Sequence, residues 1–318
     1  MIVDVFCHHI SKPVGKIIDK GKYYGEGKQM PYPVQNADAG VRLGLMDKYG
    51  IDVQAISQTT PVLLGFNAGD AAEICRLSND DNYTLCKAYP DRFVNICIVS
   101  LLDMKSAMNE LQRCIDELDC RGVTIPSNVE GKGLDSPEFF PFYEKMEKHD
   151  LPILIHPTHW DSYPLVDMEK GYRLMQMLGW PFDSSQAVWR IIMGGVLDRY
   201  PGLKIVMHHM GAMFPYLARR VEGNFSRNWK AKLGHELSHY WKNIYGDTAT
   251  DGTVASYPCG YAFFGPDRLM YGSDYPFCGE EGEDVIRENL AGIRTLDIPA
   301  REMEKILGGN AKKLLKIN

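Results

Sequence analysis

The chain has 318 residues, of which 45% are hydrophobic and 24% are charged, and its formal net charge is −6 at pH 7. An acidic chain of this kind gives no electrostatic reason to expect binding to nucleic acid or to an anionic membrane surface. No apolar stretch approaches the roughly 20 residues that a membrane span needs. We therefore expect neither nucleic acid nor a membrane as a partner.

Length and cysteine content favour one intracellular domain. A single α/β barrel takes roughly 200 to 400 residues, and no linker or internal repeat divides the chain, so we expect one domain over residues 1–318. The eight cysteines form no C-x-x-C pair, which is typical of reduced, buried thiols. The first residues already read as a strand and leave no room for a signal peptide. These features predict a cytoplasmic protein.

Apolar strand-like runs alternate with helix-like segments from end to end, which is typical of a parallel α/β fold. The expected strands are residues 2–6, 53–57, 93–99, 122–125, 152–155, 204–207, 244–247 and 268–272. The expected helices include residues 36–49, 71–89, 104–118, 184–200, 214–228, 281–296 and 300–316, and a further helix begins near residue 136. Residues 11–35 are too long and irregular for an ordinary loop. The pattern predicts a distorted (β/α)8 TIM barrel with an insertion after the first strand.

Ligand-type side chains follow several of these strands. They are His8, His156, His208, His209 and Asp274. Because the carboxyl ends of barrel strands share one rim, residues far apart in sequence should meet there. Imidazoles and a carboxylate are the groups that hold Zn²⁺ or a similar ion. The sequence therefore predicts a metal-centred active site.

The motifs around these residues resemble a known family. They are Ile2-Val3-Asp4-Val5-Phe6-Cys7-His8-His9, Leu154-Ile155-His156-Pro157, His208-His209-Met210-Gly211-Ala212-Met213-Phe214-Pro215 and Gly272-Ser273-Asp274-Tyr275-Pro276-Phe277, supported by Gly194 to Pro201 and Gly309-Asn310-Ala311. Over residues 2–316 the chain resembles the amidohydrolase superfamily. Within it, the similarity is to the branch that contains aminocarboxymuconate semialdehyde decarboxylase and the dihydroxybenzoate-type aromatic acid decarboxylases.

The resemblance implies a set of site residues. His8, His156 and Asp274 are the implied metal ligands, while His209 and Asp274 are the implied catalytic residues. The first strand of the family normally ends in Asp-x-His-x-His or a Glu-x-His variant, so Phe6 occupies the first ligand position here. Cys7 is a poor substitute because it points to the opposite face of the strand from His8. We expect one divalent ion, zinc before manganese, and no organic cofactor. A metal-free site stays open as an alternative.

Several further residues are candidates for substrate contacts or for packing. Strand alternation predicts that His209 faces the rim and that His208 faces the barrel wall. An arginine is the natural clamp for a carboxylate, which favours a small carboxylic acid as substrate. The candidate substrate-binding residues are Arg42, His159, Trp160, Arg219 and Tyr275.

The leading function is non-oxidative decarboxylation of a hydroxylated aromatic or unsaturated carboxylic acid. The alternatives are a metal-dependent hydrolase or hydratase, which opens a lactone or C–C bond or adds water to an unsaturated diacid, and a non-catalytic barrel with a decayed metal site. We also expect a homodimer, because the segment 184–200 carries more apolar residues than one barrel contact needs.

Overall fold

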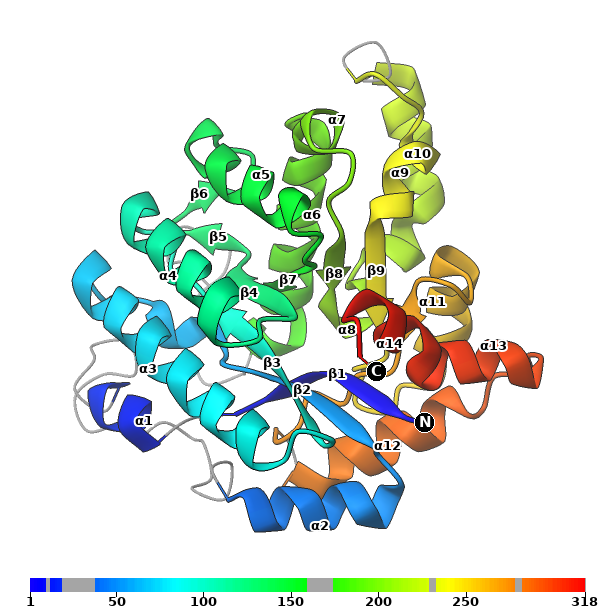
Figure 1. The fold of residues 1–318 in the computed structure, drawn as a ribbon. Coiled ribbons are helices and arrows are strands. Elements are labelled where there is room, and N and C mark those ends of the chain that lie inside the picture. Colours follow the sequence, from blue (N-terminus) through cyan, green and yellow to red (C-terminus); the bar gives the residue numbers. More distant parts are fainter. Residues whose placement is uncertain (10–11, 19–37, 159–173, 229–232, 278–281, 318) are drawn as a thin grey trace.

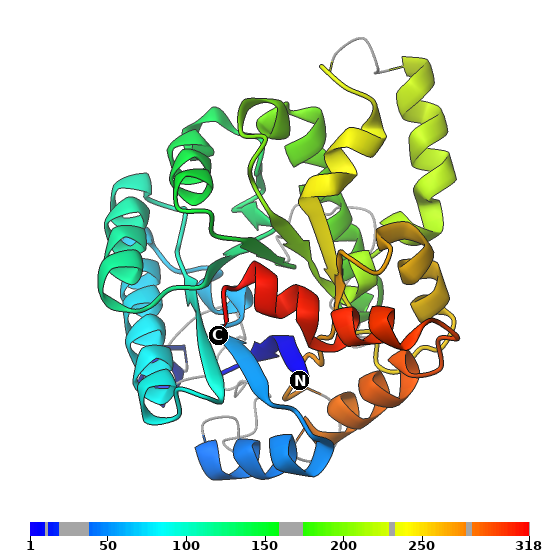
Figure 2. The same cartoon turned by 45° about the vertical axis from the view of Figure 1, so that its right-hand side comes forward.

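A ring of parallel strands wrapped by helices forms the centre of the structure (Figures 1 and 2). The computed structural model describes residues 1–9, 12–18, 38–158, 174–228, 233–277 and 282–317. Within these ranges, eight strands pair in the order β1-β2-β3-β4-β7-β8-β9-β10. They are β1 (Val3–His8), β2 (Val53–Ser57), β3 (Phe93–Ile98), β4 (Gly122–Pro126), β7 (Ile153–His156), β8 (Ile205–Met207), β9 (Ile244–Asp247) and β10 (Leu269–Met270).

Hydrogen bonds between the two ends of the sheet close the barrel. Val5 N donates to Tyr271 O at 3.0 Å and His8 N donates to Tyr275 O at 2.7 Å, which ties β1 to β10 and the residues after it. The last strand is shorter than the predicted 268–272, because only Leu269–Met270 keeps a regular ladder with β9. The predicted distorted (β/α)8 barrel is confirmed.

The strands are covered by helices on the outside. The α-helices are α1 (Lys12–Ile18), α2 (Ala39–Tyr49), α3 (Ala68–Ala88), α4 (Met104–Glu117), α5 (Phe140–Lys148), α6 (Trp180–Met193), α7 (Val196–Arg199), α8 (His208–Gly211), α9 (Phe214–Asn228), α10 (Leu237–Tyr240), α11 (Ser256–Phe264), α12 (Glu283–Ile293), α13 (Ala300–Glu304) and α14 (Asn310–Leu314). Short 3-10 turns are η2 (Thr60–Leu63), η3 (Pro137–Phe139) and η6 (Trp241–Asn243), and π-helical turns are η4 (Met175–Gly179) and η8 (Lys305–Gly309). A hairpin of β5 (Asn128–Val129) and β6 (Lys132–Gly133) follows β4 and was not predicted.

Local sequence signals set the ends of the helices. The Asp38 carboxylate accepts hydrogen bonds from Gly40 N and Val41 N and so caps the first turn of α2. Gly50 ends the same helix at φ +69°, a left-handed conformation that glycine adopts without a steric cost. The predicted helix 184–200 instead starts at Trp180 and breaks after Met193, because Gly195 adopts φ +73°.

The apolar face of α6 packs inside the chain. Ala187, Val188, Ile191 and Ile192 are at most 2% exposed. These side chains therefore cannot form the surface on which the dimer prediction was based, and the homodimer stays a prediction. Of the insertion after β1, only α1 falls among the described residues; there Val14 is buried against α3. The remainder of residues 11–35 lies outside them.

One end of the barrel is closed by the C-terminal helices. Leu314 and Leu315 pack against the inward side chains of Val3, Val53 and Met270, and both termini lie at this end (Figure 2). The opposite end, where the strands finish, carries the ligand-type side chains. No helix in the described part of the chain is long and apolar enough to cross a membrane.

Candidate active site

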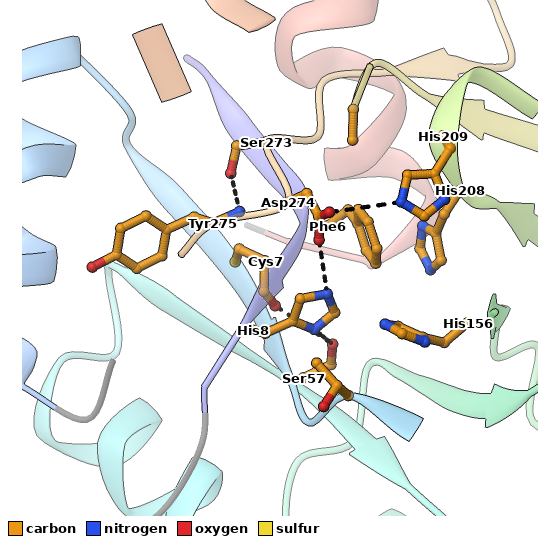
Figure 3. A network of polar contacts seen from close by, with 12 residues as sticks. Phe6, Cys7, His8, Ser57, His156, His208, His209, Ser273, Asp274 and Tyr275 are labelled. Atoms are coloured by element: carbon orange, nitrogen blue, oxygen red, sulfur yellow. Dashed lines mark hydrogen bonds and ion pairs between the residues drawn. The ribbon is translucent and has the colours of Figure 1, made fainter. Parts of the chain in front are cut away.

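The predicted metal ligands and catalytic residues, His8, His156, His209 and Asp274, meet at the carboxyl ends of the strands (Figure 3). His8 is the last residue of β1, His156 is the last residue of β7, and His209 follows β8 by two residues. Asp274 lies four residues beyond β10 and is held beside β1, because its backbone N–H donates to Phe6 O at 2.8 Å. The convergence predicted from the strand ends is therefore present in the fold.

Asp274 links two histidines at the centre of this site. Its Oδ1 lies 3.2 Å from His8 Nε2 and its Oδ2 lies 3.6 Å from His209 Nε2. Burial alone raises the pKa of the Asp274 carboxyl, but the hydrogen bonds and charges of His209 and His8 outweigh burial and hold the pKa well below its usual range. Asp274 is therefore a carboxylate between two imidazoles, as a metal ligand or a proton-transfer partner requires.

His156 is held as a neutral imidazole with one nitrogen facing the site. Its Nδ1 contacts Pro157 O at 2.8 Å and Thr60 Oγ1 at 3.1 Å. Burial, followed by the nearby charges of His8 and His208, lowers the pKa of His156 well below the ordinary value. A backbone carbonyl on Nδ1 fixes the proton there and leaves Nε2 with a lone pair, which is the usual arrangement of a metal-bound histidine.

His8 is oriented from both its side chain and its backbone. Ser57 Oγ lies 3.3 Å from His8 Nδ1, and the guanidinium of Arg42 donates to the carbonyl oxygen of His8. His8 Nε2 is buried, and it pairs with Asp274 Oδ1 at 3.2 Å without the alignment of a good hydrogen bond. A buried imidazole nitrogen and a carboxylate that face each other in this way are groups that a small cation could bind together.

His208 and His209 both face the interior, so the prediction that His208 faces the barrel wall is wrong. The His208 ring stacks on the Phe6 ring with centroids 3.6 Å apart. The centroid of the His209 ring lies 5.4 Å from that of Phe6. Alternation of side chains applies only within a strand, and β8 ends at Met207. His209 then adopts φ +57°, which turns the chain and brings consecutive imidazoles to the same side.

His209 lies at the rim beside Asp274. Its side chain is 20% exposed, and its Nδ1 is buried with no hydrogen-bond partner among the described residues. Burial lowers the pKa of His209, but the hydrogen bond and charge of Asp274, joined by the charges of Asp247 and Asp251, outweigh burial and raise it. The imidazolium form is thereby favoured.

The predicted arginine clamps are not supported. Arg42 is 1% exposed, donates to His8 and to Gln54 Oε1, and stacks over the ring of Tyr275 at 4.6 Å. It is a buried brace behind His8, because both of its terminal nitrogens donate to the protein itself. Tyr275 is 1% exposed beneath this guanidinium, so it too belongs to the support of the site.

The remaining substrate-contact predictions fall outside the site or outside the described residues. The Arg219 side chain is 97% exposed and pairs with Glu222 on α9, so it is a solvated helix residue. His159 and Trp160 lie outside the described residues. His9 Nε2 contacts Asp81 Oδ2 on α3 at 2.9 Å. The Cys7 thiol lies on the opposite face of β1 from His8, as strand alternation predicted, and donates to Ala55 O at 3.4 Å.

Several polar residues that support the site were not identified from the sequence. Asp247 ends β9 and binds His208 Nδ1 at 2.5 Å and His209 N at 3.1 Å. Asp247 could have been identified from the sequence, because it is a carboxylate at the end of an expected strand. Ser57 and Thr60, which contact His8 and His156, carry no such signal, since serine and threonine are common in any turn.

The donors fit a divalent ion in chemistry, although their present spacing does not enclose one. Two imidazoles and a carboxylate are suitable ligands, and the buried His8 Nε2 faces the carboxylate of Asp274. Among the described residues, no three histidine, cysteine or acidic side chains are gathered closely enough to hold an ion as they stand. These residues would have to rotate to hold an ion together. The Phe6 ring lies 4.7 Å from His8 and 5.9 Å from His156 and offers no donor.

Comparison with known proteins places this geometry in a family. A family model described as "Amidohydrolase" matches residues 8–317. The chain belongs to the amidohydrolase family. It is 30% identical to the 2-amino-3-carboxymuconate-6-semialdehyde decarboxylase of Dictyostelium discoideum, over 98% of this chain and 84% of that protein.

Solved structures share this fold. The 5-carboxyvanillate decarboxylase LigW of Sphingomonas paucimobilis superimposes with a TM-score of 0.87 at 26% identity, covering 100% of this chain and 99% of that one. The 5-carboxyvanillate decarboxylase of Novosphingobium aromaticivorans, complexed with manganese and a nitrobenzoic acid, gives a TM-score of 0.83 at 22% identity over 100% and 96% of the two chains. At that identity the second likeness concerns the fold alone.

Proposed function

We propose that this amidohydrolase is a metal-dependent, non-oxidative decarboxylase of a hydroxylated aromatic carboxylic acid. The observation that carries the proposal is the His8–Asp274–His209 arrangement at the barrel rim, with His156 beside it. Relatives that span nearly the whole chain are named as decarboxylases of carboxylated muconate and aromatic compounds, which supports a carboxylic acid as the substrate.

The ligand-type side chains would bind and orient the acid. A divalent ion held by His8, His156 and Asp274 would supply positive charge for the substrate carboxylate and its neighbouring hydroxyl oxygen. Arg42 and Ser57 keep the His8 ring in place, and Thr60 does the same for His156. These contacts limit the orientations that the two rings can adopt, which would lower the reorganisation needed during the reaction.

His209 is the proposed proton donor. The bond between the ring carbon and the carboxyl carbon breaks, CO₂ leaves, and the electron pair remains on the ring carbon, which takes a proton from His209 Nε2. The Asp274 carboxylate, 3.6 Å from this nitrogen, stabilises the protonated imidazole before transfer. Phe6 and Phe277 border His8 with ring centres 4.7 and 5.5 Å from it. These apolar neighbours reduce hydration of the substrate carboxylate and thereby favour its loss.

Three finer expectations belong to the same proposal. Zinc or manganese is the expected ion, since both accept imidazole and carboxylate ligands. A cytoplasmic homodimer is the expected form of the enzyme. Elemental analysis of protein purified without added metal tests the first expectation, and light scattering tests the assembly.

Release of CO₂ from a panel of mono- and dihydroxybenzoic acids tests the proposal directly. Metal-loaded protein should convert at least one acid, chelator-treated protein should lose the activity, and added Zn²⁺ or Mn²⁺ should restore it. His156→Ala should be inactive, whereas His235→Ala, an exposed histidine away from the rim, should match wild type. Chelator-resistant activity, or a release of CO₂ that survives His156→Ala, would rule out the proposed chemistry.

A further inference from the structure

Phe6 and His208 form a stacked pair in the middle of the site. Their ring centres are 3.6 Å apart and their planes differ by 15°. Phe6 stands where the resembled family carries its first ligand, so one nitrogen or oxygen donor is missing from β1. His208 brings an imidazole into the same place from β8, and both side chains are almost fully buried.

Asp247 orients the ring of His208 in a way that suits a metal ligand. The imidazole Nδ1 contacts Asp247 Oδ2 at 2.5 Å. Asp247 is itself fully buried, and its Oδ1 accepts from the backbone N–H groups of His209 and Ala249 at 3.1 Å each. A carboxylate on Nδ1 fixes the proton on that nitrogen and leaves Nε2 as a lone-pair donor, which is the support that metal-bound histidines usually have.

The His208 ring is directed toward the same space as that of His156. In Figure 3 both rings point into the region beside His8. The His156 ring centre is 5.1 Å from that of His8 and 6.3 Å from that of His208. Two imidazoles on one tetrahedral ion, with metal–nitrogen distances of about 2.1 Å, have ring centres roughly 5.4 Å apart. The His8–His156 separation is close to this value, whereas the His156–His208 separation is longer, so the His208 ring would have to move toward His156 to share an ion with it.

We infer that His208 is a ligand of the metal centre and replaces the donor that Phe6 cannot provide. The inference rests on the proposed metal-dependent function and adds a ligand that the family pattern does not place there. The ion would then be held by His8, His156 and His208 with Asp274, after a rotation that brings the outer two imidazoles closer to His156. Packing alone is a weaker account of His208, because burying an imidazole and a carboxylate is less favourable than burying an apolar pair of the same size.

Metal affinity, measured by competition with a fluorescent chelator for Zn²⁺ and Mn²⁺, tests this inference without the catalytic reaction. His208→Ala should weaken binding at least 10-fold, and Asp247→Asn, which removes the orienting carboxylate, should weaken it by about 10- to 100-fold. Co²⁺-loaded wild type and His208→Ala should also differ in their visible absorption bands, because those bands report the number and type of ligands. His235→Ala is the matched control and should bind like wild type.

The variant Phe6→His separates a ligand role from a structural one. It returns an imidazole to β1, so Phe6→His/His208→Ala should regain most of the affinity that His208→Ala loses, which a purely structural defect would not allow. If His208→Ala unfolds, Asp247→Asn still decides the question, because it keeps the His208 ring and removes only the carboxylate that orients it. Unchanged affinity in His208→Ala and Asp247→Asn, with loss of binding in His156→Ala, would overturn the inference and leave the metal site intact. A wild-type protein that binds no divalent ion would instead refute the metal-dependent function itself.

Discussion

Replacing His209 by asparagine should remove most of the activity and leave the fold unchanged. The backbone at His209 has φ +57° and ψ +54°, a left-handed conformation that asparagine tolerates better than most residues. Asparagine therefore avoids the strain that alanine would add, and the measured effect belongs to the imidazole. The His209 side chain is 20% exposed and contacts Asp274 Oδ2 only at 3.6 Å.

The expected loss follows from the role proposed for this imidazole. A positioned acid–base group contributes roughly 10²- to 10⁴-fold to a rate, which is about 2.7–5.4 kcal/mol of activation free energy at 1.36 kcal/mol per tenfold. The contribution to folding should be small, because the ring is partly exposed and makes one long ion-pair contact. We expect kcat to fall by that factor, while the melting temperature and the metal content stay near the wild-type values.

The assay combines initial rates of CO₂ release with thermal unfolding and metal analysis. His208→Asn is the matched control, because it alters the neighbouring imidazole, which is 1% exposed and bonded to Asp247. It should lower the melting temperature and the metal affinity together. An active His209→Asn, or a loss of metal from that variant comparable with His208→Asn, would refute the assignment of His209 as the proton donor.

Three further predictions concern the support of the site and the assembly. Arg42→Met should cost about 2–4 kcal/mol of unfolding free energy, since it leaves buried acceptors on His8 and Gln54 without a charged donor. Arg219→Met is the control and should change the unfolding free energy in denaturant by under about 0.5 kcal/mol. Equal effects of the two substitutions would contradict the role of Arg42 as a brace. Burial raises the pKa of Asp4 from 3.8 to about 7, so its contribution to stability is fully present below about pH 3.8 and is lost as the pH rises through 7. The unfolding free energy of wild type relative to Asp4→Asn should therefore fall between about pH 3.8 and pH 7 by at most about 4 kcal/mol, at about 1.4 kcal/mol per pKa unit. A difference between the two proteins that does not change with pH in urea titrations would argue against a raised pKa of Asp4. Light scattering should give twice the 36.0 kDa chain mass, with charged substitutions in the exposed apolar side chains yielding monomer; a wild-type mass near one chain would exclude the dimer. These side chains are Met177, Leu178, Phe182, Met213 and Tyr216.

The barrel and the converging strand ends were predictable because they follow from patterns that are local in sequence. Strands buried on both faces read as apolar runs, and barrel geometry brings their carboxyl ends to one rim. His8, His156 and Asp274 could therefore be placed together before the structure was known. Their positions depend on strand order and strand ends, and both were visible in the chain.

The directions of individual side chains outside the strands were not predictable in the same way. His208 was expected to face the wall because alternation was extended beyond Met207, where the strand ends. The left-handed conformation of His209 involves no glycine, so no local signal marked it. Arg42 was expected to bind substrate, but its partner is a backbone carbonyl of a distant strand, and such a contact leaves no trace in sequence.

The most direct test of the central claim follows a substrate labelled with ¹³C in its carboxyl group, incubated in D₂O with metal-loaded protein and observed by NMR. Decarboxylation predicts that the label appears as ¹³CO₂ and bicarbonate, and that the product carries one deuterium at the carbon that lost the carboxyl group. His209→Asn should slow both signals together. A product that keeps the ¹³C label and gains oxygen from water would contradict the account, because the enzyme would then be a hydrolase or hydratase.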